Sequence, residues 1–216
     1  MRDPVVTRHY FDERPPVASH PRKIRARLRG REWTFMTDRG VFGRHAVDAG
    51  TRFLIETMHI APTDRVLDVG CGYGPVGLVA AALASAGRAV LVDVNERAVH
   101  LARENAVLNN VPNIEVLVGD GTTPVAGRTF DVAVTNPPIR AGRATILRLM
   151  REVWDILRPG GRLVFVARTA QGAKTLAREV AAIFGTVTEL AREGGYRVFE
   201  ATKGDAAVPK PTARDV

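Results

Sequence analysis

The chain has 216 residues, 45% of them hydrophobic and 25% charged, which is ordinary for a soluble globular protein with one main domain. No apolar stretch approaches the roughly 18 residues that a membrane span needs. The first residues carry acids and prolines where a signal peptide has an apolar core, so we expect a cytoplasmic protein. The single cysteine, Cys71, excludes an internal disulfide and a cysteine-based metal site, and we expect no metal. The net charge of +8 favours a polyanionic partner such as nucleic acid, although arginine-rich composition also arises in GC-rich genomes.

Residues 1–50 are predicted to form an N-terminal arm and a basic β-hairpin. The arm, about 1–22, is rich in proline and mixed in charge, which is typical of a loosely ordered segment. From residue 23 apolar and basic side chains alternate until Gly30, which predicts a strand, a tight turn and a second strand at 32–36. The alternation places three arginines on one strand face: Arg25, Arg27 and Arg29. That face either contacts the phosphates of a nucleic acid or is simply solvated.

Residues 51–202 have the pattern of a single α/β domain. Short apolar runs predict strands at 65–69, 89–94, 114–119, 130–135 and 162–167, and amphipathic patterns predict helices at 48–58, 75–86, 96–109, 143–157 and 170–183. Because nearly continuously apolar strands are buried on both faces, this alternation predicts a doubly wound, mostly parallel sheet. Two last strands, 186–191 and 196–202, have no helix between them and should form an antiparallel hairpin before a disordered tail at 203–216.

The first predicted strand ends in a glycine loop, VLDVGCGYGP at 66–75. Ligands of such sheets bind outside the carboxyl ends of the strands. The glycines of the loop are Gly70, Gly72 and Gly74. They allow a tight turn and a close approach to a ligand, and Pro75 suits the first turn of the next helix. The string also satisfies the GxGxxG of nicotinamide-binding proteins, but Asp68 would face a pyrophosphate there and suits a cationic amine instead.

Two further strand exits carry carboxylates. Asp93 follows Gly74 by 19 residues (93 − 74), which places a carboxylate where it can accept hydrogen bonds from a ribose diol. A helix cap is the alternative role for this aspartate. The third exit, Gly119-Asp120-Gly121, either presents a carboxylate to an adenine amino group or forms an ordinary Asp-Gly turn.

Together these residues resemble the class I S-adenosylmethionine-dependent methyltransferases, with VLDVGCGYGP, VDVN, GD and TNPP in the expected order over about residues 51–202. The resemblance implies a Rossmann-like, seven-stranded sheet of order 3-2-1-4-5-7-6 with one antiparallel strand, and S-adenosylmethionine as cofactor. It implies that Asp68 and Gly70 lie near the methionine part of the cofactor, that Asp93 binds the ribose hydroxyls and that Asp120 binds the adenine. The full set of implied cofactor residues is Asp68, Gly70, Gly72, Gly74, Asp93, Asn95, Asp120, Gly121 and Asn136.

The fourth strand ends in Asn136-Pro137-Pro138, which we predict to be catalytic. Asn136 offers a side-chain carbonyl oxygen, and the two prolines have no N–H and a fixed φ, which stiffens the backbone carbonyls between them. Two such acceptors bind a planar amine best as its nitrogen becomes pyramidal, so they favour methyl transfer without a base acting first. This stretch resembles the Asn/Asp-Pro-Pro motif of class I methyltransferases that methylate an amine nitrogen: adenine N6, guanine N2 or a glutamine amide. An aromatic residue usually follows, where this chain has Ile139.

A narrower resemblance links the chain to the small-domain methyltransferase family, over roughly residues 9–202. It rests on HYF at 9–11, FMTDRGVF at 35–42, DAGTRFLIE at 48–56, LDVGCGYGPVGL at 67–78, VDVNERAV at 92–99 and TNPPIRAG at 135–142. That family includes ribosomal RNA guanine-N2 methyltransferases of the small subunit, so the resemblance implies action on guanine N2 of 16S ribosomal RNA. We expect the protein to act as a monomer or homodimer. The residues expected to contact this RNA are Ile139, Arg140, Arg143, Phe42, Arg25, Arg27 and Arg29.

Other functions remain open on the sequence alone. The same Asn-Pro-Pro chemistry serves a protein glutamine amide or an adenine N6 in DNA or RNA. A non-catalytic S-adenosylmethionine-binding or RNA-binding module and a nicotinamide oxidoreductase are the alternatives from other classes. The intact acidic and glycine residues at the strand exits argue against a degenerate module.

Overall fold

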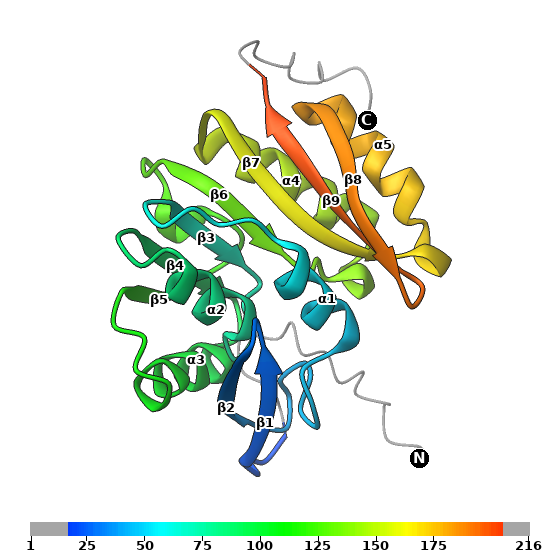
Figure 1. The fold of residues 1–216 in the computed structure, drawn as a ribbon. Helices are drawn as coiled ribbons and strands as arrows, with labels where there is room; N and C mark the ends of the chain where they lie inside the picture. Colours follow the sequence, from blue (N-terminus) through cyan, green and yellow to red (C-terminus); the bar gives the residue numbers. More distant parts are fainter. Residues whose placement is uncertain (1–16, 205–216) are drawn as a thin grey trace, which may run out of the picture.

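The computed structural model describes residues 17–204, which form a seven-stranded α/β sheet with a two-stranded sheet beside it (Figure 1). Most of the predicted arm, up to residue 16, and the predicted tail from residue 205 lie outside the described residues. The strands of the large sheet are β3 (Arg65–Val69), β4 (Arg88–Asp93), β5 (Ile114–Val118), β6 (Phe130–Thr135), β7 (Leu157–Arg168), β8 (Gly185–Glu193) and β9 (Tyr196–Lys203). The helices are α1 (Ala49–Thr57), α2 (Pro75–Leu83), α3 (Glu96–Leu108), α4 (Arg143–Ile156) and α5 (Ala173–Phe184), with short 3₁₀ turns η1 (Thr123–Val125), η2 (Ile139–Ala141) and η3 (Thr169–Gln171).

The order of the large sheet is β5-β4-β3-β6-β7-β9-β8, which confirms the predicted order 3-2-1-4-5-7-6. β9 runs antiparallel to both of its neighbours, and the other pairs are parallel. The chain order reverses between β3 and β6. In open parallel sheets ligands bind outside the carboxyl ends of the strands at such a reversal, so the topology places the site there.

Helices cover both faces of the sheet, which explains why its central strands are almost continuously apolar. α1, α2 and α3 pack on one face, and α4 and α5 pack on the other (Figure 1). Successive side chains of β3 enter different cores: Val66 packs with the first group of helices and Leu67 with the second, and both are fully buried. None of the described helices is long and apolar enough to cross a membrane.

The predicted hairpin is confirmed. β1 (Arg22–Leu28) pairs antiparallel with β2 (Arg31–Thr37), and the apolar side chains of both strands face inward. Trp33 and Phe35 are buried in the same core as α1, α2 and α3. The hairpin therefore shares its core with the large domain.

Two asparagines, one in the last turns of α3 and one at its C-cap, form hydrogen bonds with the outer edge of β2. Asn105 accepts the N–H of Met36 at 2.6 Å and donates to its carbonyl at 2.9 Å, and Asn109 does the same for Thr34 at 3.0 and 2.7 Å. These amides supply the bonds that a further strand would make, so the edge is closed. Asn105 also donates to the carbonyl of Tyr73 at 2.9 Å, which ties the hairpin to the glycine loop.

The structure corrects the expected position of Arg29. β1 ends at Leu28, and Arg29 lies in the turn with a left-handed φ of 50°. Its guanidinium donates to the carbonyls of Glu56 and Met58 at the end of α1, at 3.1 and 2.6 Å. It therefore does not share the strand face of Arg25 and Arg27, because the turn directs it toward α1.

The C-terminal boundaries also differ from the expectation. β9 continues through Lys203, whose ammonium donates to the carbonyls of Trp154 and Leu157 at 2.7 Å each, so the expected tail cannot begin at this residue. The helix expected at 170–183 begins at Ala173, since Gly172 adopts a φ of 81° after η3.

Candidate active site

A pocket opens at the reversal of strand order, and its empty space, including the solvent at its mouth, is about 1140 Å³. Its walls are the glycine loop after β3, the loops after β4, β5 and β6, and the segment that joins the hairpin to α1. The expected cofactor and catalytic residues that line it are Asp68, Gly70, Gly72, Asp93, Asn95, Asp120, Gly121, Asn136, Pro137 and Pro138. The topology thus brings four separate strand exits into one cavity.

The glycine loop turns sharply back over the end of β3. Gly70 and Gly72 have left-handed φ values of 73° and 56°, and a Cβ at either position would meet no atom within 4 Å. The backbone conformation therefore requires glycine, and the space beside it stays open to a ligand. Gly74 differs, because it packs behind the loop against α2 and α3 and does not line the pocket.

Asp68 is buried at the end of β3. One of its carboxylate oxygens accepts the N–H of Gly77 in the first turn of α2, at 2.7 Å. Burial raises the pKa of Asp68 to about 7, with a smaller contribution from the negative charge of Asp93, and the hydrogen bond from Gly77 only partly opposes this. A cationic group beside Asp68 would stabilise its ionised form, so this corner of the pocket favours an ammonium.

Asp93 holds the glycine loop and also faces the pocket. Its Oδ2 accepts the N–H of Gly72 at 2.7 Å, and its Oδ1 accepts the N–H of Asn95 at 2.9 Å. Burial raises the pKa of Asp93 in spite of these bonds. A carboxylate has about four acceptor positions, so capacity remains for the hydroxyl groups of a ligand.

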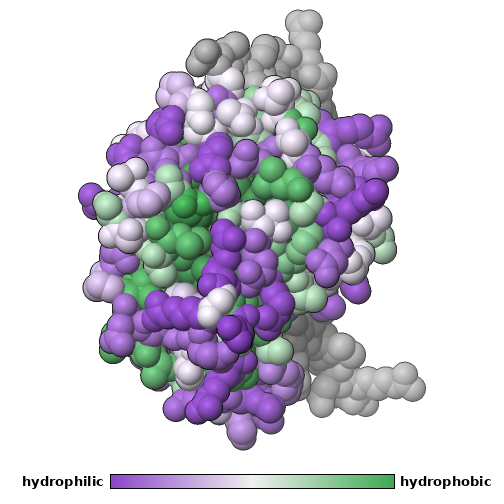
Figure 2. Space-filling view, in the orientation of Figure 1, coloured by the Kyte–Doolittle hydropathy of each residue, from purple (hydrophilic) through white to green (hydrophobic). Residues whose placement is uncertain are grey.

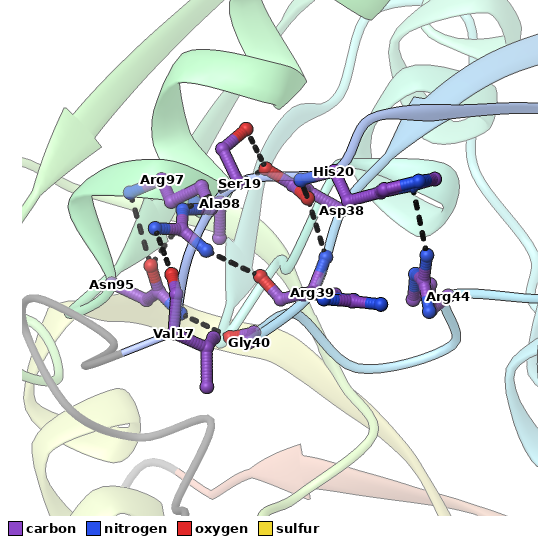
Figure 3. Close-up of polar contacts among 10 residues, drawn as sticks. All are labelled: Val17, Ser19, His20, Asp38, Arg39, Gly40, Arg44, Asn95, Arg97 and Ala98. Carbon is purple, nitrogen blue, oxygen red and sulfur yellow. Dashed lines mark hydrogen bonds and ion pairs between the residues drawn. The ribbon is translucent and has the colours of Figure 1, made fainter.

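Asn95 acts as the cap of α3. Its Oδ1 accepts the N–H groups of Arg97 and Ala98 at 3.0 and 3.2 Å, and its Nδ2 donates to the carbonyl of Gly40 at 2.8 Å (Figure 3). The side chain lines the pocket, but these bonds use both ends of its amide. Asn95 therefore fixes the loop after β4 at the pocket wall.

The segment before α1 is fastened to the same end of α3. Arg97 donates to the carbonyls of Arg39 and Val17 at 2.7 and 2.8 Å and forms an ion pair with Asp38 at 3.7 Å (Figure 3). Asp38 also accepts the N–H of Arg39 at 2.6 Å. These contacts hold the segment that contributes Phe42 to the pocket wall, where this ring is 41% exposed.

Asp120 and Gly121 follow β5 at the far side of the pocket. Arg148 of α4 donates to Asp120 at 3.0 Å and also pairs with Glu152. A side chain at Gly121 would collide with the carboxylate of Glu152, and its φ is 57°. The carboxylate expected to bind adenine is thus oriented by an arginine that the sequence did not indicate.

Asn136 lines the pocket beside Thr51. Its Nδ2 donates to the Thr51 hydroxyl of α1 at 2.9 Å, whereas Oδ1 has no hydrogen bond among the described residues. The carbonyl of Pro138 accepts the N–H of Ala141 at 2.9 Å within η2. The Asn136 side-chain oxygen is thus left to accept a hydrogen bond from a ligand.

The expected substrate residues divide into two groups. Phe42 lines the pocket, whereas Ile139 packs partly buried against the core beneath α4 and α5. Arg140 is exposed in η2, and Arg143 forms an ion pair with Glu179 of α5, with Nε 2.8 Å from Oε1. The role of Arg143 in binding RNA stays a prediction.

Arg25 and Arg27 are exposed on the outer face of β1 and do not line the pocket. Figure 2 shows a largely hydrophilic surface in the region of β1 and β2, at the bottom of the view. We refer to Arg25 and Arg27 as the hairpin arginines.

Sequence reasoning missed Thr51 and Arg148, which hold two of the predicted site residues. Thr51 is buried, 5% exposed, in the first turn of α1, where Asp48 accepts its N–H at 3.2 Å. The sequence could have indicated Thr51, because it is a polar residue on the buried side of the first turn of a helix. Arg148 has no such signal, because an arginine four residues before Glu152 is ordinary on an exposed helix face.

The sheet order, the glycine loop and the acidic strand exits define a class I methyltransferase. The chain belongs to the methyltransferase small domain family, whose model matches residues 32–200, and it is therefore an S-adenosylmethionine-dependent methyltransferase. The residues of the pocket fit that cofactor, because the buried carboxylates can accept hydrogen bonds from its ammonium group and from its ribose hydroxyls. Among the described residues no cluster of three or more His, Cys, Asp or Glu could hold a metal ion, and the absence of a metal stays a prediction.

Three relatives illustrate the comparison. The chain is 36% identical to the uncharacterized protein YbxB of Bacillus subtilis (strain 168), over 92% of its own length and all of that protein. It is 33% identical to ribosomal RNA small subunit methyltransferase C of Serratia proteamaculans (strain 568), over 76% of this chain and 47% of that one. The T. thermophilus 16S rRNA N2 G1207 methyltransferase (RsmC), solved with AdoMet and guanosine, matches with a TM-score of 0.76 and 27% identity, over 88% of this chain and 52% of that one. The chain thus spans about half the length of the two named ribosomal RNA methyltransferases.

Proposed function

We propose that the protein transfers a methyl group to an exocyclic amine of a nucleobase in RNA, specifically guanine N2 of 16S ribosomal RNA. The observation that carries this proposal is the placement of Asn136 and Pro137 in the pocket wall, with the Asn136 amide nitrogen bonded to Thr51. The relatives support the choice of substrate, because two of them are named for the small ribosomal subunit RNA and one was solved with guanosine.

In this proposal the cofactor residues take separate roles. S-adenosylmethionine, when bound, supplies an electrophilic methyl group on a sulfonium. Asp68 binds its ammonium, Asp93 accepts hydrogen bonds from its ribose, and Asp120 accepts from its adenine amine. Gly70 and Gly72 leave room for close approach, and Asn95 keeps the loop after β4 in position.

The acceptor residues act on the amine. The Asn136 Oδ1 and the Pro137 carbonyl would accept its two N–H bonds and stabilise the positive charge that grows on the nitrogen as the N–C bond forms. The methyl–sulfur bond would break at the same time and leave its electron pair on sulfur, so that the product is S-adenosylhomocysteine. No base is required before the transfer, because the nitrogen lone pair attacks directly. A proton leaves the nitrogen afterwards to solvent.

RNA docking is proposed for three places on the surface. The hairpin arginines contact phosphates, and Arg140 contacts the backbone near the pocket. Phe42 in the pocket wall and Ile139, which follows Pro138, contribute apolar contact. We do not assign phosphate contacts to Arg29 or Arg143. The Arg29 guanidinium is bonded to the end of α1, and the Arg143 guanidinium is bonded to Glu179. A monomer or homodimer in the cytoplasm stays our prediction for the active form.

The test uses the purified full chain with labelled S-adenosylmethionine and, as acceptors, small subunits and naked 16S RNA from a strain that lacks the gene. We expect N2-methylguanosine on nucleoside mass spectrometry, and none with the Asn136→Ala variant. N6-methyladenosine, or label found in a protein glutamine, would instead establish one of the two other amine acceptors. If the protein transferred no methyl group to any of these substrates, the proposal would be wrong.

A further inference from the structure

We infer that Thr51 is a positioning residue for methyl transfer, because its hydroxyl accepts a hydrogen bond from the Asn136 amide nitrogen and leaves the Asn136 oxygen for the acceptor amine. This inference rests on the proposed function of Asn136 as an acceptor of N–H bonds. An asparagine presents either an oxygen that accepts or an NH₂ group that donates, and the two ends have nearly the same shape. A planar amine needs the oxygen, so the orientation of the amide decides whether the residue works.

The contact that sets this orientation is direct and partly buried. The Asn136 Nδ2 lies 2.9 Å from the Thr51 Oγ1, and Thr51 is 5% exposed. Both side chains line the pocket, so the other end of the amide is the one available to a substrate. A hydrogen bond from the nitrogen to a fixed hydroxyl thus presents Oδ1 to the acceptor.

Thr51 is itself held by its surroundings. Asp48 caps α1 by accepting the N–H groups of Gly50 and Thr51 at 2.9 and 3.2 Å, which fixes the first turn. A Cβ at Gly50 would collide with the ring of Tyr196, so the helix begins in close contact with β9. The hydroxyl therefore projects from a rigid part of the molecule.

The hairpin anchors the remainder of the same helix. Arg52 donates to the Arg27 carbonyl at 2.8 Å, and Arg29 binds the carbonyls of Glu56 and Met58. The element that carries the hairpin arginines thus also positions the helix that orients Asn136. This gives the N-terminal part of the chain a place in the catalytic geometry as well as in docking.

The first experiment compares Thr51→Val with the matched control Thr51→Ser. Valine keeps the shape and removes the hydroxyl, whereas serine keeps the hydroxyl. Since deleting a group that stabilises transition-state charge costs about 10²–10³-fold, loss of its orientation should lower kcat by about 10-fold. The dissociation constant of S-adenosylhomocysteine and the melting temperature should change little, and Thr51→Ser should restore most of the rate.

A double-mutant cycle separates orientation from packing. Asn136→Asp replaces the amide with a carboxylate whose two oxygens both accept, so orientation no longer matters. In that background Thr51→Val should change the rate by less than about 2-fold if the two residues act as a coupled pair. An equal loss in both backgrounds would show that Thr51 acts through packing alone and would overturn the inference.

A measurement without any RNA keeps the inference distinct from the proposed function. The side-chain NH₂ resonances of Asn136, assigned by their absence from Asn136→Asp, should be protected from exchange in the wild type and in Thr51→Ser but not in Thr51→Val. Unchanged resonances in Thr51→Val would refute the inference even if the enzyme methylates RNA. Failure of wild-type activity with the expected NMR change would refute the proposed substrate instead.

Discussion

The cofactor half and the acceptor half of the pocket are built in different ways. In the cofactor half the supports of the glycine loop are close in sequence: Asp93 holds Gly72 and Asn95, and Asp68 holds Gly77. In the acceptor half the support comes from far away, because Thr51 lies 85 residues from the Asn136 that it orients. The glycine loop is therefore a local motif, whereas the acceptor half exists only once the whole chain has folded.

This difference predicts that the two halves fail separately. Loss of a residue in the cofactor half should weaken cofactor binding and leave the methyl-accepting geometry intact. Loss of a residue in the acceptor half should lower the rate with the cofactor still bound. The variants below are arranged by the size of the expected effect.

Asn136→Ala should give the largest effect. It removes an oxygen whose hydrogen bond to the amine becomes stronger as positive charge develops on the nitrogen. Removal of such a group costs about 10²–10³-fold in kcat. Single-turnover methyl transfer under saturating cofactor measures this loss. Calorimetry with S-adenosylhomocysteine is the control, and its dissociation constant should stay within a few-fold of wild type. If affinity fell as far as the rate, the proposed division of the pocket would be wrong.

Asp93→Ala should show the opposite pattern. Hydrogen bonds to a charged group contribute about 1.5–3 kcal/mol, which corresponds to about 10- to 100-fold in the affinity for S-adenosylhomocysteine. The rate at saturating cofactor should fall much less. Asp93→Asn is the matched control, since it keeps the size of the side chain and one acceptor oxygen. A melting curve checks that the loop held through Gly72 still folds.

The same contrast explains what could be predicted from the sequence. Asp68, Asp93 and the glycine loop were predictable because strand and helix periodicity places them at known exits, and the order of the sheet followed from the resemblance. Thr51 and Arg148 were not, because their partners come from other elements and only packing brings them together. Arg29 was misplaced for a related reason, since alternation in a strand does not show where the strand ends.

A pH titration sharpens the comparison within the cofactor half. The pKa of Asp68 is raised by burial to about 7, so the free protein holds a proton there that an ammonium ligand must displace. Affinity for S-adenosylhomocysteine should therefore rise by about 10-fold between about pH 6 and about pH 8, because a tenfold change accompanies each pH unit below the pKa. Asp68→Asn should bind more weakly and lose this pH dependence.

Stability of the free protein should change with pH in the opposite direction. A carboxyl whose pKa is raised in the folded state binds its proton more tightly there than in the unfolded chain. The contribution of Asp68 is thus complete below its ordinary pKa of 3.8 and is lost as the pH rises through about 7. Thermal unfolding of wild type and Asp68→Asn over this range measures the difference, and a stability gap that does not vary with pH would contradict the assignment.

The smallest effect is expected on the surface that lies outside both halves. Arg25→Ala combined with Arg27→Ala should weaken RNA binding a few-fold and reduce the salt dependence by about 0.7 to 0.9 for each phosphate that is no longer bound, because fewer counterions are released. Arg143→Ala is the matched control, since its guanidinium is paired with Glu179 and its removal should leave the slope unchanged. Arg29→Ala should lower the melting temperature with little effect on the slope, because it bonds to the end of α1. If the double variant kept the wild-type salt dependence of RNA binding, the outer face of β1 would be a solvated surface. The RNA would then be bound near Arg140 at the rim of the pocket.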